Sequence, residues 1–147
     1  MESEVFLWSH VLNSRTAIIL GALLAAAAVG LGAYAAHGLE KQIVAFGYEA
    51  DLARRLAWFE TGVKYHLYHA LGIIVVALIA ERRGASRLLT VASLLFLAGI
   101  VLFSGSLYAM TLLSASWSKL GAVVPLGGAS FIAGWILLAV GVAKNSD

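Results

Sequence analysis

The chain alternates long apolar stretches with short polar connections. A membrane-spanning helix needs about 20 apolar residues, and the charge-free stretches at 16–36, 88–113 and 120–143 are all long enough. A fourth stretch, 61–80, is interrupted only by Lys64 and two histidines, and Lys64 lies near enough to its end for the ammonium to reach the headgroups. The pattern predicts four transmembrane helices in a single integral membrane domain that covers residues 1–147.

The stretch at 16–36 also has features of a signal peptide. Arg15 precedes it, and Ala33, Tyr34 and Ala35 have the small–any–small pattern of a cleavage site. Its apolar run is longer than the 7–15 residues that are usual for a signal peptide. We therefore expect this stretch to remain as a transmembrane helix.

The link between the first two spans has an amphipathic pattern. Leu52, Leu56 and Phe59 recur at helical spacing, and Asp51, Arg54 and Arg55 occupy the opposite, polar side. This pattern predicts a helix that lies on the membrane surface and runs into the second span. A plain solvated loop is the alternative.

Composition strengthens the membrane interpretation. Of the 147 residues, 61% are hydrophobic and 12% are charged, whereas about a quarter of the residues in a soluble domain are charged. Ten Lys and Arg against eight Asp and Glu, with no basic run, argue against nucleic acid as a partner. The absence of cysteine excludes disulfides, thiolate nucleophiles and cysteine-ligated metal sites. The expected surroundings are the lipid bilayer.

Orientation depends on a nearly even distribution of basic residues. If both termini lie on one side, five Lys and Arg fall on each side of the membrane. Short loops carry the most weight in the positive-inside rule, and the compact loop 81–87 contains three arginines. We therefore predict cytoplasmic termini in a bacterial inner membrane.

Small residues recur along the spans at spacings that suit helix packing. In a bilayer, close backbone approach takes the place of the hydrophobic attraction between helices. A seven-residue recurrence favours near-antiparallel, left-handed packing. The fold predicted is an all-α, membrane-embedded antiparallel four-helix bundle, and the glycines expected at its helix contacts are Gly32, Gly99, Gly127, Gly134 and Gly141.

The polar residues of the spans converge in one half of the membrane. In an up-down bundle, the ends of spans one and three lie beside the starts of spans two and four. A helical projection places most of the polar residues of span two on one broad face, which we expect to point toward the bundle interior or water. The predicted polar cluster contains His37, Glu60, Lys64, Tyr65, His66, Tyr68, His69, Ser104, Ser106 and Tyr108.

Four roles remain open for this cluster. It can be structural, through hydrogen bonds between helices. It can hold a metal ion through His37, His66 and His69, because imidazole is a common ligand. It can carry protons or ions along Glu60, Tyr65 and His69, or it can bind a quinone-like molecule. The cofactor is unassigned, and no catalytic residue is predicted because the G-x-S-x-G order is absent around Ser104 and Ser106.

Four ordered motifs carry a family resemblance: "LGAYAAHGL" (31–39), "FETGVKYHLYHALG" (59–72), "LFSGSLY" (102–108) and "VPLGGASFIAGW" (124–135). Together they resemble the small membrane proteins of domain-of-unknown-function 423, also called the transmembrane protein 256 family. The resemblance implies a multi-pass protein of about four spans and no particular activity. The small size of the chain and its glycine-lined helix faces lead us to expect a non-enzymatic structural or accessory membrane component in a homo-oligomer or larger membrane complex, with permeation or ligand binding as the alternative.

Overall fold

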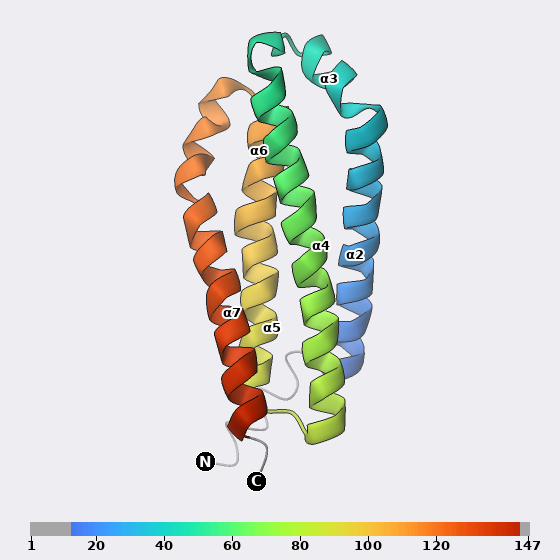
Figure 1. The fold of residues 1–147 in the computed structure, drawn as a ribbon, viewed down its shortest axis with the longest axis vertical. Helices are drawn as coiled ribbons and strands as arrows, with labels where there is room; N and C mark the ends of the chain where they lie inside the picture. Colours follow the sequence, from blue (N-terminus) through green and yellow to red (C-terminus); the bar gives the residue numbers. More distant parts are fainter. Residues whose placement is uncertain (1–12, 145–147) are drawn as a thin grey trace.

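The computed structural model describes residues 13–144, and four long rods form an antiparallel bundle (Figure 1). They are α2 (Ser14–His37), α4 (Leu52–Arg83), a third rod made of α5 (Arg87–Gly99), the π-helical turn η2 (Ile100–Ser104) and α6 (Gly105–Leu112), and finally α7 (Val124–Lys144). All four are long and apolar enough to cross a membrane. The predicted all-α four-helix fold is confirmed.

The rods pack in a simple spatial order. Helix α2 packs on α4, α4 packs on the third rod, and the third rod packs on α7 (Figure 1). Helix α3 (Leu39–Ala45) and the 3₁₀ turn η1 (Glu49–Asp51) connect α2 to α4, and the 3₁₀ segment η3 (Ala115–Ala122) connects α6 to α7. These connections lie at one end of the bundle, which we call the α3 end. The turn between α4 and α5, the start of α2 and the end of α7 lie at the opposite end.

Local sequence explains where the helices begin and end. The side chain of Asn13 accepts a hydrogen bond from the Thr16 amide (2.8 Å) at the start of α2, and Ser86 accepts one from the Leu89 amide (3.3 Å) at the start of α5. Such caps satisfy amide groups that have no partner within the helix. Gly84 ends α4 with a φ of 89°. Glycine adopts this positive φ readily because it has no Cβ atom to clash with the backbone.

The link between the first two spans differs in part from the prediction. Leu52, Leu56 and Phe59 belong to the first turns of α4 and continue directly into the span. The separate short helix is α3, which precedes them and buries Leu39 and Ile43 against Phe59. The amphipathic pattern thus extends a transmembrane helix beyond the membrane.

Glycines in α7 allow close contact with the third rod. A Cβ atom added at Gly134 would lie 2.6 Å from the Phe96 ring, and one at Gly141 would lie 3.3 Å from Leu89. Gly127 lies against the backbone of Phe103. Gly99 of α5 lies in the same way under the ring of Phe131, and Gly32 of α2 faces Val63 across a looser gap.

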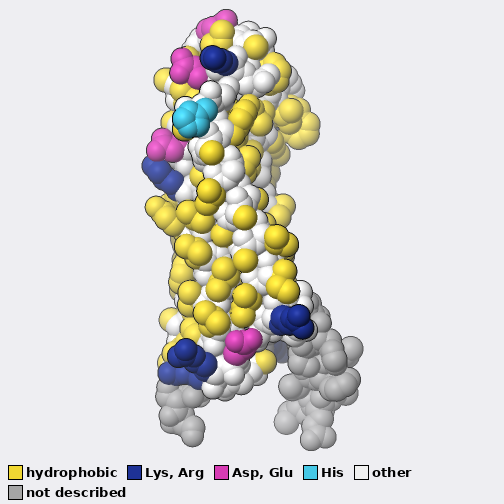
Figure 2. Space-filling view, turned by 90° about the vertical axis from the view of Figure 1, so that its right-hand side faces the viewer, with side chains coloured by type: hydrophobic (Ala, Val, Ile, Leu, Met, Phe, Trp, Pro, Cys, Tyr) yellow, Lys and Arg dark blue, Asp and Glu magenta, His cyan; other side chains and the backbone are white. Residues whose placement is uncertain are grey.

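A hydrophobic band indicates where the bilayer lies. The charge-free segment 16–36 of α2 is about 31 Å long at 1.5 Å per residue, which matches a hydrocarbon core of about 30 Å. Arg15 and His37 flank this segment. Figure 2 shows the same division, with yellow hydrophobic side chains between two zones of charged groups and a histidine in the upper zone. The α3 end therefore projects into the headgroup region.

Candidate functional site

Buried polar side chains gather between α4 and the third rod. Within the described residues, all seven buried polar or charged side chains belong to these two elements. We call them the polar seam; they are Arg55, His66, His69, Ser93, Ser104, Ser106 and Thr111. Polar groups at membrane depth face the interior of a bundle because hydrocarbon offers them no partner.

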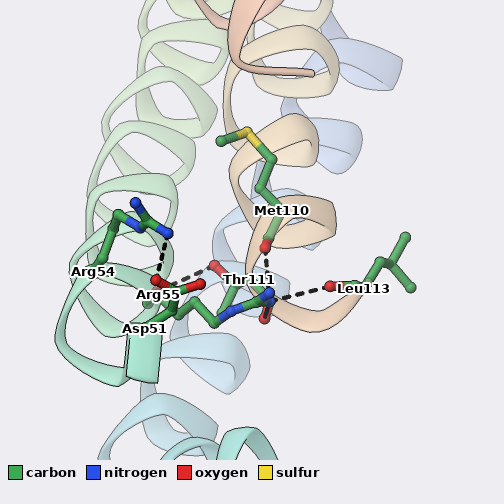
Figure 3. Close-up of polar contacts among 6 residues, drawn as sticks. All are labelled: Asp51, Arg54, Arg55, Met110, Thr111 and Leu113. Atoms are coloured by element: carbon green, nitrogen blue, oxygen red, sulfur yellow. Dashed lines mark hydrogen bonds and ion pairs between the residues drawn. The ribbon is translucent and has the colours of Figure 1, made fainter. Parts of the chain in front are cut away.

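Arg55 caps the end of α6 at the top of the seam. Its Nη1 atom donates to the carbonyl oxygens of Met110 (3.0 Å), Thr111 (2.6 Å) and Leu113 (3.1 Å), as Figure 3 shows. The last carbonyls of a helix have no partner within it and form the negative end of the helix dipole. The guanidinium also lies 3.8 Å from the ring centroid of Tyr48. Carbonyls and an aromatic face therefore compensate most of the buried charge, while Nε has no hydrogen-bond partner among the described residues.

The expected position of Arg55 on the polar side of an amphipathic helix was wrong. Its neighbour Arg54 does lie on the surface, where it pairs with Asp51 (Figure 3), but Arg55 is only 3% exposed. Adjacent helical residues differ by about 100° in direction, so one of two consecutive arginines can point into the bundle while the other points to the surface. The Thr111 hydroxyl contacts the Arg55 carbonyl at 3.2 Å. Helices α4 and α6 are therefore linked by side-chain contacts that start from each of them.

His69 is held on both ring nitrogens. Its Nδ1 lies 2.7 Å from the Tyr65 carbonyl, and the indole N–H of Trp135 donates to its Nε2 at 3.1 Å. A carbonyl only accepts and an indole N–H only donates, so these contacts fix the neutral tautomer with the proton on Nδ1. The ring also stacks on Phe131, with centroids 3.4 Å apart and planes 9° apart.

His66 is paired on one side only. Its Nδ1 lies 3.3 Å from the Tyr108 hydroxyl, while its buried Nε2 has no hydrogen-bond partner among the described residues. The buried hydroxyl of Ser104, one helical turn before Tyr108, has none there either. This stretch of the seam is polar but incompletely paired.

Other members of the predicted cluster lie on the outer surface. Glu60 and Lys64 form an exposed ion pair with 2.8 Å between Oε1 and Nζ. Tyr68 is 56% exposed, and His37 is exposed at the end of α2. Helix α4 has α2 on one side and the third rod on another, so a third side remains free, and the cluster divides between the interior and the surface.

Tyr65 lies between these two groups. It is 40% exposed, yet its ring centroid lies 4.7 Å from that of Phe103 and 6.0 Å from that of Phe131. Ser106, another member of the predicted cluster, belongs to the interior group because it is buried in α6. Tyr65 thus covers the aromatic cluster around His69 from the outside.

The three histidines proposed as metal ligands do not come together. Among residues 13–144 there is no group of three or more His, Asp or Glu side chains that could hold a metal ion. His37 stands at the α3 end, and the ring of His69 is fully engaged by other partners.

Sequence reasoning missed Arg55, Thr111, Phe131 and Trp135 as parts of this site. Trp135 offered a signal, because an indole N–H in the middle of a span needs an acceptor on another helix. The capping role of Arg55 had no such signal, since the α6 carbonyls it binds become its neighbours only in the folded bundle.

Comparison with known proteins identifies close relatives. Residues 31–128 match the family model "Protein of unknown function (DUF423)". The chain is 48% identical over 127 residues to the UPF0382 membrane protein YwdK of Bacillus subtilis, an alignment that covers 86% of this chain and 95% of the relative. It is 37% identical over 134 residues to the UPF0382 inner membrane protein YgdD of Escherichia coli, covering 90% and 93% of the two chains. No solved structure matches the chain.

Proposed function

This chain belongs to the DUF423 family of multi-pass membrane proteins, and we propose that it acts as a non-enzymatic structural or accessory component of the bacterial inner membrane. The inner-membrane assignment rests on the name of the relative YgdD. The single observation that carries the functional proposal is the closed environment of His69, the last polar side chain before the apolar run 70–80 of span two.

The closed environment argues against a transport role for this residue. A proton relay needs an imidazole that can gain a proton on one nitrogen and release one from the other. In His69 one nitrogen is held by a carbonyl and the other by an indole donor, and the ring is stacked on Phe131. Glu60, another group of the suggested path, pairs with Lys64 on the outer surface. The geometry therefore favours a rigid packing unit.

The outward face of α2 supports an accessory role through association. Among the long helices, α2 packs mainly on α4, and its opposite side exposes small residues at four- and three-residue spacing: Ala22, Ala26, Gly30 and Ala33. A Cβ atom added at Gly30 would meet nothing within 4 Å. Small residues allow two membrane helices to approach closely, so we propose that this face contacts a second copy or another membrane protein.

Cysteine cross-linking tests this proposal cleanly, because the chain has no cysteine of its own. Ala26→Cys and Ala33→Cys would be oxidised in native membranes and compared with Ile132→Cys, which lies on the lipid-facing side of α7 and is 64% exposed. We expect a disulfide-linked dimer, or a thiol-reactive cross-link to another protein, from α2 and not from α7. Only monomers at both α2 positions would refute association through α2.

Flux measurements test the alternative function. Proteoliposomes of the wild type and of His69→Phe would be loaded with a pH-sensitive dye and given a proton or potassium gradient. The proposal expects leakage equal to that of empty liposomes in both. Wild-type flux that His69→Phe abolishes would overturn it in favour of permeation.

We also propose that the termini are cytoplasmic. The end of the bundle that holds the start of α2 and the end of α7 carries Arg15, the three arginines of loop 81–87 and Lys144. At the α3 end, Arg55 is folded into the bundle, which leaves fewer basic residues in accessible connections there. A membrane-impermeant maleimide applied to intact spheroplasts should label Ala45→Cys and spare Ala85→Cys; the reverse pattern would invert the orientation.

A further inference from the structure

We propose that the groove between the end of α2, α3 and the start of α4 binds a zwitterionic phospholipid whose headgroup carries a primary amine. The groove lies on the outer surface at the α3 end. Lipid binding there would be a role in addition to the structural one proposed above. It has two adjoining parts with volumes of about 440 Å³ and 300 Å³. Both parts are lined by Ala35, Ala36 and Leu56, and we call the whole the α2–α3 groove.

The depth of this groove matches the boundary between headgroups and hydrocarbon. Its polar part contains His37 and Lys41, and its deeper part reaches Gly32. Five residues of helix separate Gly32 from His37, which is about 7.5 Å along the axis. Figure 2 shows charged side chains and a histidine directly above the hydrophobic band. A phospholipid seated there would place its phosphate among polar groups and the start of an acyl chain along Gly32 and the alanines.

The small residues of α2 give the groove an apolar wall, and their side chains are too short to fill the groove. Ala35 and Ala36 on α2 face Leu56 of α4 across the groove. A Cβ atom at Gly32 would already touch Val63 at 3.5 Å, so the groove becomes shallow at that point. An acyl chain would cover this wall through ordinary van der Waals contact.

The charges around the groove complement both ends of a zwitterionic headgroup. Lys41 and His37 offer N–H donors to a phosphate, and Glu40 offers a carboxylate to an amine. Glu60, whose Oε1 pairs with Lys64, offers its second carboxylate oxygen. Within residues 13–144, neither Glu40 nor Lys41 forms an ion pair. Charge-assisted hydrogen bonds between such groups are stronger than neutral ones.

The balance of these charges selects the class of lipid. Lys41 and Lys64 offset Glu40 and Glu60, so a neutral headgroup fits this surface better than an anionic one. A primary ammonium has three N–H donors for the carboxylates, whereas a quaternary ammonium has none. The groove is therefore expected to prefer phosphatidylethanolamine over phosphatidylcholine and phosphatidylglycerol.

Native mass spectrometry with defined lipids tests this preference. The full chain would be purified in mild detergent, mixed with equimolar phosphatidylethanolamine, phosphatidylcholine and phosphatidylglycerol, and examined for retained lipid. The wild type should retain one phosphatidylethanolamine in preference to the other two. Lys41→Gln should weaken its retention about fivefold, since one charge-assisted hydrogen bond is lost at a partly solvated site.

Matched variants separate the groove from general effects. Ala36→Leu fills the groove and should lower retention, while Ala129→Leu makes the same change on an exposed part of α7. Lys119→Gln removes the same charge at the same end of the bundle, on η3. Both controls should bind as the wild type does, and all four variants change exposed positions. Equal retention of the three lipids, a preference for phosphatidylglycerol, or equal loss in variants and controls would overturn the proposal.

Discussion

Replacing Arg55 with alanine should destabilise the bundle more than any change to its surface charges. A hydrogen bond from a charged group contributes about 1.5–3 kcal/mol. Nη1 has two hydrogens for three carbonyl oxygens, so two full bonds are counted, which gives about 3–6 kcal/mol. The contact with Tyr48 adds about 0.5–1 kcal/mol.

Water recovers part of this loss, because the site borders the surface. Leu113 is 39% exposed, and a groove that includes Arg55, Trp58 and Met110 in its lining reaches the outside. Water can therefore replace the guanidinium at some of the freed carbonyls. We expect a net loss of about 3 kcal/mol for Arg55→Ala, and a smaller loss for Arg55→Lys, which keeps a donor but not the planar contact with Tyr48.

The measurement is reversible unfolding in mixed micelles with increasing dodecyl sulfate, followed by helical circular dichroism. Arg54→Ala is the matched control, because it removes the neighbouring charge from an exposed ion pair with Asp51, and such pairs contribute about 0–1 kcal/mol. Equal losses in Arg55→Ala and Arg54→Ala would refute the capping role of Arg55.

Three further predictions use the same unfolding assay. Gly127→Ala should cost about 2 kcal/mol because its Cβ would press on the Phe103 backbone, whereas Gly128→Ala, whose Cβ would lie 3.8 Å from the Phe103 ring, should be neutral; equal effects would contradict this packing. Thr111→Val should cost about 1 kcal/mol by removing its hydroxyl contacts, and Ser104→Ala should cost nothing because its hydroxyl has no partner among the described residues; a larger loss for Ser104→Ala would show a missed partner. Trp135→Phe should cost about 1 kcal/mol by removing the donor to His69, with the exposed Trp117→Phe as the silent control; equal effects of the two would argue against that bond.

The helices were predictable from sequence because lipid imposes a length and an apolar composition on each span. The charge-free stretches 16–36 and 120–143 fall within α2 and the last apolar helical segment. The boundary of the second span was less predictable. Leu52 to Phe59 form an amphipathic pattern that fits a surface helix and the projecting end of a long helix equally well, and only the position of α3 distinguishes them.

The division of the polar cluster could not be predicted from one helix alone. A helical projection shows which residues share a side but not how many neighbours the helix has. Lys64 and Tyr68 lie on the free side of α4, and the line of exposed residues continues through Leu71 and Val75 into the hydrocarbon. His66 and His69 lie on sides covered by the third rod and α7. Their partners Tyr108 and Trp135 are 42 and 66 residues away in sequence.

The π-helical turn in the third rod affects how this span can tolerate insertions and deletions. The Gly105 amide bonds the Ile100 carbonyl, five residues back, so the turn holds about one residue more than an α-helical turn. Below it, Gly99 of α5 meets α7, and above it, Thr111 of α6 meets α4. Removing one residue here would restore a regular α-helix and leave the two halves facing nearly as they do now, because the turn already absorbs the extra residue. The same deletion within α5 or α6 would rotate one half against the other by about 100°. The third rod should therefore tolerate a one-residue deletion better within 100–104 than within the regular helices on either side of this turn.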